Sequence, residues 1–301
     1  MGNASAPLQG IFPYLVSPVD PTTGKVKTTV LGRLVEYLIE QGIHGLSPLG
    51  STGEFPYLSH EQRLAIVRTT VQAAGGHVPV VPGVAAFATA DAIQQAHRYL
   101  EAGATGIVLM LQTFFPLPPT AIQEYFATVA ETAECPVILY SNPGVLGADL
   151  NPEIIIELSK IENISYYKDA SGNTGRLLTI LNGAGDSIRF FSASAHIPLL
   201  VFALGGVGWM SGPACVVPRQ CVRLWDLWQR GNWDEAFALQ RRLWRINELF
   251  QKYSLAACVK AGLELQGFDV GGPIPPQPVL DRSAYDEIAT ALQDLALVVS
   301  A

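Results

Sequence analysis

The stretch VILYSNPGVLGADLNPEIIIELSKIENISYYK, residues 137–168, contains one complete unit of the fold. Val137–Tyr140 and Ile164–Lys168 are short runs of mostly apolar and aromatic residues, which is typical of strands buried on both faces. Between them, Asn151 followed by Pro152 predicts a helix start, with asparagine as the N-cap and proline in the first helical position. The spacing leaves room for one strand, one helix and two loops. The stretch therefore predicts a strand–helix–strand unit with parallel strands.

The same unit recurs along the chain. Eight apolar runs have starts 20 to 35 residues apart; they are Gly10–Leu15, Gly45–Leu49, Val78–Gly83, Gly106–Leu111, Val137–Tyr140, Ile164–Lys168, Ile188–Ser192 and Gly208–Ser211. The intervening segments carry helix signals, such as the apolar face from Leu31 to Leu38 and the capping box of Ser59 and Gln62. Eight such units predict an α/β fold, a closed (β/α)8 TIM barrel.

The pattern changes after Gly231. Asn232 is expected to cap a long helix that runs through Phe250, and further helices are expected at 255–266 and near 284–298, with a Gly- and Pro-rich break at 271–276. No strands alternate with these helices. We therefore expect two domains, a barrel catalytic domain at 1–231 and a C-terminal helical subdomain at 232–301.

Composition excludes several classes of protein. Of the 301 residues, 49% are hydrophobic and only 15% are charged, which argues against disorder. The 26 acidic and 19 basic side chains give a net charge of -7, so nucleic acid is not expected as a partner. Because few charged side chains are available to cover a monomer, we expect part of the surface to be buried in an oligomer.

Cysteine usage and the chain start favour a cytoplasmic protein. The four cysteines form no C-x-x-C pair and have no histidine at ligand spacing, so neither disulfides nor a zinc site are expected. Met1–Ala6 lacks the basic region and apolar run of a signal peptide. The uncharged stretch Ile197–Pro218 contains three prolines and four glycines, which predict a helix, a turn and a strand rather than a membrane span.

In a TIM barrel the active site lies at the carboxyl ends of the strands. Lys168 ends its run, and burial there would lower its pKa and make it a nucleophile; the alternative is a solvated lysine. Tyr140 also ends a run and could transfer a proton, or it could simply pack in the core. Ser51 and Thr52, between two glycines, could bind a carboxylate or form an ordinary turn.

Two other features carry no functional expectation. Residues 205–208, Gly-Gly-Val-Gly, precede the last run and so lie on the face away from the active site, which excludes a nucleotide loop. His196 alone of the five histidines lies near the predicted active site, and no histidines pair as metal ligands. We expect neither a metal nor a cofactor.

Four motifs together resemble the dihydrodipicolinate synthase / N-acetylneuraminate lyase family of class I, Schiff-base-forming aldolases. They are GSTGE at 50–54, YSNPG at 140–144, YKDASG at 167–172, and KAGLEL at 260–265 followed by GGP at 271–273. The order of the motifs and their spacing match the family over nearly the whole chain.

The resemblance implies a homotetrameric barrel enzyme without metal or cofactor. It implies that Lys168 forms a Schiff base with pyruvate or another 2-oxo acid and that Tyr140 acts as the general acid and base. Ser51 and Thr52 would bind the substrate carboxylate, Ser51 would hydrogen bond to Tyr140, and Met210 would approach the substrate through its backbone.

The chain departs from the family pattern at three places. Val145 occupies the position where dihydrodipicolinate synthases usually carry an arginine that binds the aldehyde's carboxylate. The relay tyrosine donated across the dimer interface falls at Phe115 or its neighbour Phe114, and Ser51 replaces the commoner threonine. Valine cannot replace the bidentate cation.

These departures lead to three hypotheses. The first is a lyase or aldolase whose second substrate is a less anionic aldehyde, with an apolar or aromatic end suggested by Val145, Leu146, Phe114 and Phe115. The second is dihydrodipicolinate synthase itself, acting on pyruvate and aspartate semialdehyde. The third is a non-catalytic family member that binds 2-oxo acids.

Overall fold

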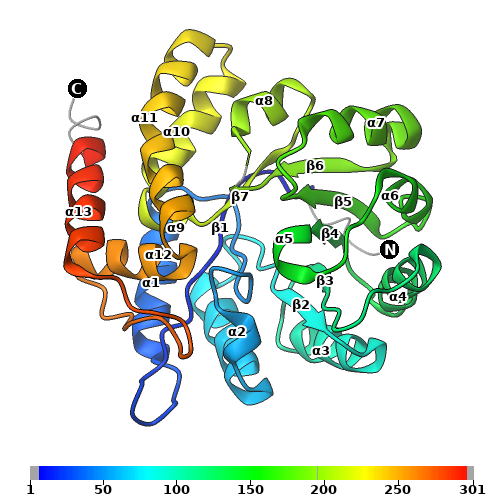
Figure 1. Ribbon diagram of the computed structural model, residues 1–301, viewed down its shortest axis with the longest axis horizontal. Helices are drawn as coiled ribbons and strands as arrows, with labels where there is room; N and C mark the ends of the chain where they lie inside the picture. The colour runs from blue at the N-terminus through cyan, green and yellow to red at the C-terminus, as the bar shows by residue number, and fades with distance from the viewer. Residues whose placement is uncertain (1–6, 195, 297–301) are drawn as a thin grey trace.

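A ring of parallel strands surrounded by helices forms the body of the molecule (Figure 1). This structure, a computed structural model, describes residues 7–194 and 196–296. The strands are β1 (Gly10–Pro13), β2 (Gly83–Ala86), β3 (Ile107–Leu111), β4 (Val137–Ser141), β5 (Ile164–Asp169), β6 (Arg189–Ser192) and β7 (Gly208–Ser211). Their order in the sheet is β1-β7-β6-β5-β4-β3-β2, and every pairing is parallel.

Residues 45–48 close the barrel between β1 and β2. Ser47 bridges to Tyr14 and Leu46 bridges to Val80, both in parallel. The strands expected at Gly45–Leu49 and Val78–Gly83 are therefore present only as bridged extended segments, and β2 begins at Gly83. The physical reason is that Pro48, Pro79 and Pro82 lack the backbone N–H that a continuous ladder needs. The expected (β/α)8 fold is confirmed.

The helices lie outside the strands and along one flank. They are α1 (Thr28–Glu40), α2 (His60–Ala74), α3 (Thr89–Glu101), α4 (Pro119–Thr132), α5 (Pro143–Leu146), α6 (Pro152–Leu158), α7 (Thr174–Ala184), α8 (Pro198–Ala203), α9 (Pro213–Val216), α10 (Pro218–Gln229), α11 (Trp233–Lys252), α12 (Leu255–Leu265) and α13 (Arg282–Ala296). The predicted caps form at Ser59, with a full capping box, and at Asn151. Asn232 precedes α11 as expected, but its side chain makes no capping hydrogen bond.

Helices α11, α12 and α13 lie together beside α1, α9 and α10 (Figure 1). They correspond to the expected helical segment after Gly231, and residues 297–298 of the last expected helix lie outside the described residues, as does Met1–Ala6. The domain boundary at 231/232 stays a prediction. Residues from α11 and α12 nevertheless line the same cavity as residues from the barrel strands.

The barrel interior is filled by large side chains from the strands. Phe12 of β1 and Phe191 of β6 pack edge to face with ring centroids 5.3 Å apart, and both are buried. Such a filled core leaves space for a ligand only at the ends of the strands. Among the described residues, no helix has both the length and the apolar character needed to cross a membrane; Ile197–Pro218 divides into α8, β7 and α9.

Candidate active site

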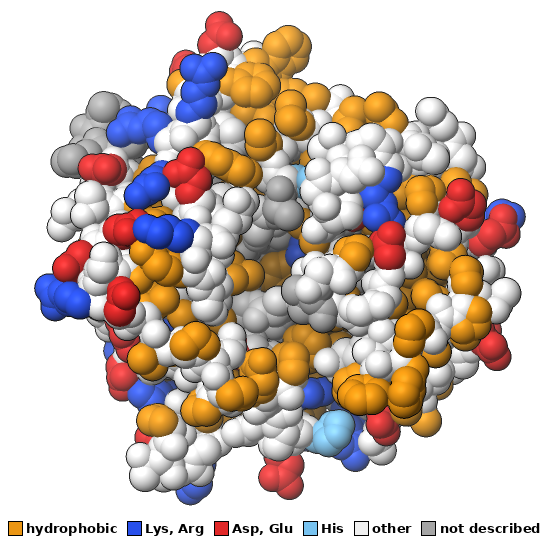
Figure 2. Space-filling model, viewed as in Figure 1, with side chains coloured by type: hydrophobic (Ala, Val, Ile, Leu, Met, Phe, Trp, Pro, Cys, Tyr) orange, Lys and Arg blue, Asp and Glu red, His pale blue; other side chains and the backbone are white. Residues whose placement is uncertain are grey.

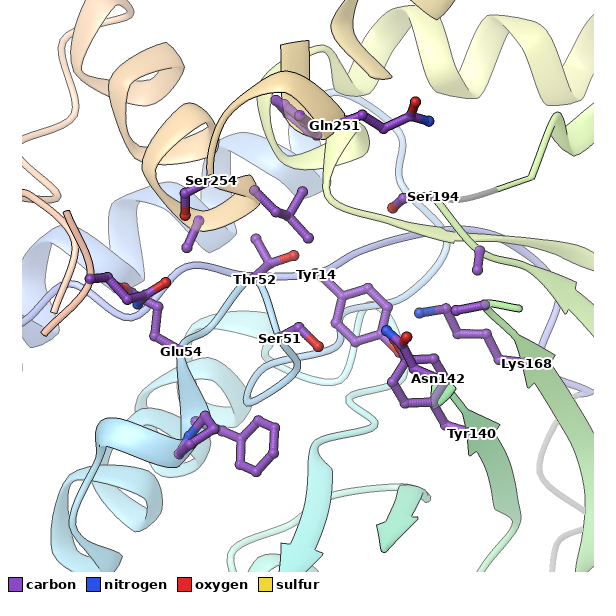
Figure 3. Close-up of a pocket in the computed structure, with 18 of the residues that line it drawn as sticks. Tyr14, Ser51, Thr52, Glu54, Tyr140, Asn142, Lys168, Ser194, Gln251 and Ser254 are labelled. Atoms are coloured by element: carbon purple, nitrogen blue, oxygen red, sulfur yellow. The ribbon is translucent and has the colours of Figure 1, made fainter. Parts of the chain in front are cut away.

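A cavity of about 530 Å³ opens at the carboxyl ends of the strands. Strands β4 and β5, the turn at 51–54 and helices α11 and α12 each contribute side chains to it, and Figure 3 shows Lys168, Tyr140 and Tyr14 gathered on one side of it. Figure 2 shows the same face hollowed at its centre, with most charged side chains toward its periphery. The structure therefore brings the sequence-predicted residues Lys168, Tyr140, Ser51 and Thr52 to one cavity.

Lys168 is the next-to-last residue of β5 and is buried. Its Nζ lies 4.2 Å from the centroid of the Tyr14 ring and 4.0 Å from that of the Tyr140 ring. Burial lowers the pKa of Lys168 from its ordinary value to about 7, and the neighbouring Asp169 carboxylate partly opposes that shift. A substantial fraction of the amine is therefore neutral near pH 7, which is the form that attacks a carbonyl carbon.

Tyr140 lies beside Lys168 because the two residues are direct partners in the register of β4 and β5. Its hydroxyl oxygen accepts a hydrogen bond of 3.0 Å from Asn142 Nδ2. Burial raises the pKa of Tyr140, while polar contact with Asn142 and Ser51 lowers it. The phenol is thus protonated near neutral pH and close enough to Lys168 to exchange protons with a group bound there.

The turn at Ser51 and Thr52 places two hydroxyl side chains in the cavity wall. A Cβ atom at Gly50 would come within 2.3 Å of the Tyr14 ring, so only glycine lets the turn approach that ring. Ser51 Oγ is buried and has no hydrogen bond of ordinary geometry to any described residue, although the Ser51 hydroxyl lies near enough to Tyr140 to affect its pKa. The turn therefore has hydrogen-bonding capacity left for a ligand.

Asp169 and His196 form a second polar layer behind Lys168. His196 Nε2 lies 3.5 Å from Asp169 Oδ2, and both side chains are buried. The carboxylate also accepts hydrogen bonds from the Tyr167 hydroxyl at 3.1 Å and from Ser171 Oγ at 2.7 Å. Burial lowers the pKa of His196, with Asp169 opposing. His196 does not line the cavity, and its charge would interact with both Asp169 and Lys168.

Three positions that the sequence singled out are not among the described residues that line the cavity of this chain. Met210 lies within β7, paired with Phe12, and is not among the described residues that line the cavity. Phe114 and Phe115 project from the loop after β3 with 82% and 72% of their surfaces exposed, outside the cavity. The side chain of Val145 lies outside the described part of the structure, so its contacts are not assigned.

Several cavity residues were not identified from the sequence. Tyr14 follows β1 and is the only hydroxylated side chain in the run Gly10–Leu15, a signal that could have identified it. Asn142 is separated from Tyr140 by one residue. Asn247 and Gln251 come from α11, whose sequence shows only an amphipathic pattern.

Glu54 and Lys260 form a buried ion pair at the edge of the cavity, with Lys260 Nζ 2.5 Å from Glu54 Oε2. Glu54 Oε1 accepts hydrogen bonds of 2.6 Å from the Ile274 backbone N–H and from Gln277 Nε2. The pair joins the turn at 51–54 to α12 and to the loop before α13. Among residues 7–194 and 196–296, no cluster of three or more His, Cys, Asp and Glu side chains is arranged to hold a metal ion.

Comparison with known proteins gives a consistent result. The model of the dihydrodipicolinate synthetase family matches residues 7–295. A 4-hydroxy-tetrahydrodipicolinate synthase from Magnetococcus marinus is 34% identical over 259 residues, covering 86% of this chain and 88% of that protein. An uncharacterised DapA-like lyase of Halobacterium salinarum is 30% identical over 291 residues, covering 97% and 95% of the two chains.

A solved structure has the same fold over almost the whole chain. It is a prophage protein of the dihydrodipicolinic acid synthase family from E. coli K12, in complex with pyruvate. The two structures superpose with a TM-score of 0.89 at 28% sequence identity, and the match covers 97% of this chain and 100% of that protein.

Proposed function

The chain belongs to the dihydrodipicolinate synthetase family and is a lyase-type enzyme, and from this premise we propose that it is a class I aldolase acting on pyruvate or another 2-oxo acid. The observation that carries the proposal is the buried Lys168, with a pKa of about 7, between the rings of Tyr14 and Tyr140. The relative solved with bound pyruvate supports a 2-oxo acid as the ligand.

In the proposed reaction the neutral Lys168 amine attacks the keto carbon, and the resulting carbinolamine loses its hydroxyl as water to give a protonated imine. Tyr140 moves one proton from the reacting amine to the alkoxide and then protonates the departing hydroxyl, and its phenolate takes up the proton that the adjacent carbon loses in the next step. The imine then withdraws electrons, so that the adjacent carbon can lose a proton and form an enamine. The enamine carbon adds to an aldehyde carbon, or the reverse steps cleave that bond.

The carboxylate of the 2-oxo acid is proposed to bind at Ser51 and Thr52. Ser51 Oγ has no partner of ordinary geometry among the described residues, and the turn at 51–54 sits in the wall of the same cavity as Lys168. Hydroxyl and backbone N–H donors on a tight turn suit a carboxylate. The Met210 backbone is kept as a further proposed contact from the family resemblance.

The second substrate is proposed to be an aldehyde without a carboxylate at its far end. Among the described residues that line the cavity, Lys168 is the one basic side chain, and the acidic one, Glu54, is paired with Lys260. Arg176, in the first turn of α7, donates a hydrogen bond of 3.0 Å to Asp149 and does not line the cavity. An anionic aldehyde would therefore lack a cationic partner there.

Dihydrodipicolinate synthase activity is the second candidate, supported by the name of the Magnetococcus relative. A coupled assay with pyruvate and aspartate semialdehyde distinguishes the two: turnover faster than with neutral aldehydes would favour this activity. A non-catalytic 2-oxo-acid-binding protein is the third, and turnover that is lost in Lys168→Ala would exclude it. We also propose a cytoplasmic homotetramer.

The Schiff base is tested by trapping. Reducing the protein with borohydride in the presence of pyruvate should add the mass of pyruvic acid less one oxygen atom to the peptide that contains Lys168. Lys168→Arg, which keeps the charge but cannot form the adduct, is the matched control, and lactate replaces pyruvate in a second control. An intact, folded protein that gains no mass at Lys168 would refute the proposal.

A further inference from the structure

Helix α11 contributes two amide side chains to the cavity wall. Asn247 lies on α11, lines the cavity and is 3% exposed. Gln251, one turn later on the same helix, also lines it, and Figure 3 shows Gln251 on the side of the cavity away from Tyr140 and Asn142. The cavity therefore has an α11 side that is chemically distinct from its Lys168 side.

The orientation of the Asn247 amide is fixed by its neighbour. One amide atom lies 3.2 Å from the backbone carbonyl oxygen of Ser194, and a carbonyl can only accept a hydrogen bond, so that atom must be Nδ2. Ser194 is itself held in place, because its Oγ accepts a hydrogen bond of 3.2 Å from the Gly212 N–H. It follows that the other amide atom, Oδ1, cannot share this contact.

Asn247 Oδ1 is buried and has no hydrogen-bond partner in the part of the chain that the structure describes. A buried acceptor without a partner costs free energy that a ligand's donor can recover. A carboxylate has no donor, so its approach to Oδ1 would be repulsive. An apolar chain would leave Oδ1 unpaired and shielded from water. A hydroxyl group can donate to Oδ1 and satisfy it.

We propose that Asn247 is a specificity-determining residue, whose Oδ1 accepts a hydrogen bond from a hydroxyl group of an uncharged second substrate. The inference rests on the proposed aldolase function and names the substrate class: a 2-oxo acid combined with, or cleaved to, a neutral hydroxylated aldehyde. It replaces the expectation of an apolar or aromatic aldehyde, which depended partly on Phe114 and Phe115, two residues outside the cavity.

The experiment compares three aldehydes, each with pyruvate: glyceraldehyde, its deoxy counterpart propanal, and the anionic succinic semialdehyde. Wild-type kcat/KM should be highest for glyceraldehyde. In Asn247→Leu, the ratio of kcat/KM for glyceraldehyde to that for propanal should fall about tenfold or more. Because the two proteins are compared through this ratio, the intrinsic reactivities of the aldehydes cancel.

Gln240→Leu is the matched control. Gln240 is a buried amide on the same helix that does not line the cavity, so this variant makes the same chemical change away from the ligand and should leave the ratio unchanged. Asn247→Ala, which introduces no bulk, is measured in parallel. The pyruvate and borohydride adduct at Lys168 reports for each variant whether the keto-acid end of the site is intact.

An unchanged ratio in variants that still form the adduct would overturn the role of Asn247, as would a wild-type preference for propanal or succinic semialdehyde. If neither Asn247 variant forms the adduct, the proposal is tested by the wild-type ranking of kcat/KM for the three aldehydes. Absence of the adduct in the wild-type protein would instead overturn the proposed function itself.

Discussion

Lys168 Nζ lies 4.0 Å from the centroid of the Tyr140 ring, and the two residues are direct partners across the pair of strands β4 and β5. This relationship follows from the strand register, because side chains of partnered residues leave a sheet on the same face. The apolar side of the ring removes water from the amine, while the hydroxyl remains available for proton transfer. One pairing thus accounts both for the lowered pKa of the lysine and for the position of its proton donor.

The rate of imine formation should depend on pH through Lys168. Because its pKa is lowered to about 7, the neutral fraction grows about tenfold per pH unit below pH 7 and levels off above it. Rapid trapping of the pyruvate adduct between pH 5 and pH 9, on the order of one measurement per half unit, gives the curve. A midpoint near the ordinary value of lysine would contradict the burial of the amine.

Asp169 should shift that curve in a defined direction. Its carboxylate stabilises the ammonium form and so raises the pKa of Lys168. Asp169→Asn removes the charge while keeping a side chain of the same shape, and the midpoint of the trapping curve should therefore move to lower pH. Circular dichroism serves as the control for folding, because Asp169 also accepts hydrogen bonds from Tyr167 and Ser171. A shift of the midpoint to higher pH would contradict the stabilisation of the ammonium form by Asp169.

The buried lysine should also cost stability. The unfolded chain binds the proton with the ordinary lysine pKa, so between about pH 7 and pH 10.5 the unfolded state holds more protons and stability rises with pH. At pH 6 the full cost applies. Lys168→Met should raise the free energy of unfolding there by on the order of 5 kcal/mol, and the gain should shrink toward pH 10. Urea denaturation at fixed protein concentration measures the gain in unfolding free energy at pH 6 and its decrease toward pH 10. A gain that did not change with pH would show that the titration of Lys168 does not cause it.

Tyr140 and Asn142 should have separable effects on turnover. Tyr140→Phe removes the hydroxyl and should lower kcat by about 100-fold or more, while slow trapping of the pyruvate adduct persists. Asn142→Val removes only the donor to the Tyr140 oxygen, which should raise the pKa of Tyr140 and lower kcat by about tenfold. Equal losses in the two variants would indicate that Asn142 contacts the substrate directly.

The barrel and Lys168 could be predicted from the sequence because each depends on local information. The apolar runs recur at even spacing, and Lys168 ends one of them, so its place at the carboxyl end of a strand follows from the fold. The segments near Ser47 and Val80 form isolated bridges rather than the expected continuous strands, because the prolines in them lack the N–H donors that a ladder needs.

Residues that reach the cavity from outside the strand ends could not be predicted in the same way. Asn247 lies on an amphipathic helix, and its sequence pattern shows which residues are buried but not that one buried amide faces a cavity. Phe115 is a different case: the resemblance gives its position a role across a subunit interface, and in this chain its ring is exposed outside the cavity. Both outcomes depend on tertiary packing.

The exposed aromatic rings of Phe114 and Phe115 should belong to a subunit interface. They pack against each other edge to face, with centroids 5.0 Å apart. Together they expose a contiguous apolar area to solvent, which stable monomers rarely do. Phe115→Glu should therefore shift the assembly toward smaller species in sedimentation velocity. Trp233→Glu, at an exposed aromatic on α11, is the comparison and should leave the assembly unchanged. If only Trp233→Glu dissociated the assembly, the interface would lie at the face that carries Trp233 rather than at Phe114 and Phe115.

The buried pair of Glu54 and Lys260 should be coupled in stability. Lys260→Met leaves a buried carboxylate without its cation, and Glu54→Gln leaves a buried ammonium whose remaining partner is the Gly272 carbonyl at 2.8 Å, so each should cost about 3–5 kcal/mol of unfolding free energy. The double variant has no buried charge at this position and should cost clearly less than the sum of the two. Because Glu54 ends the turn that carries Ser51 and Thr52, the single variants should also raise the KM for pyruvate. Additive stability losses in the double-mutant cycle would show that the two side chains act independently.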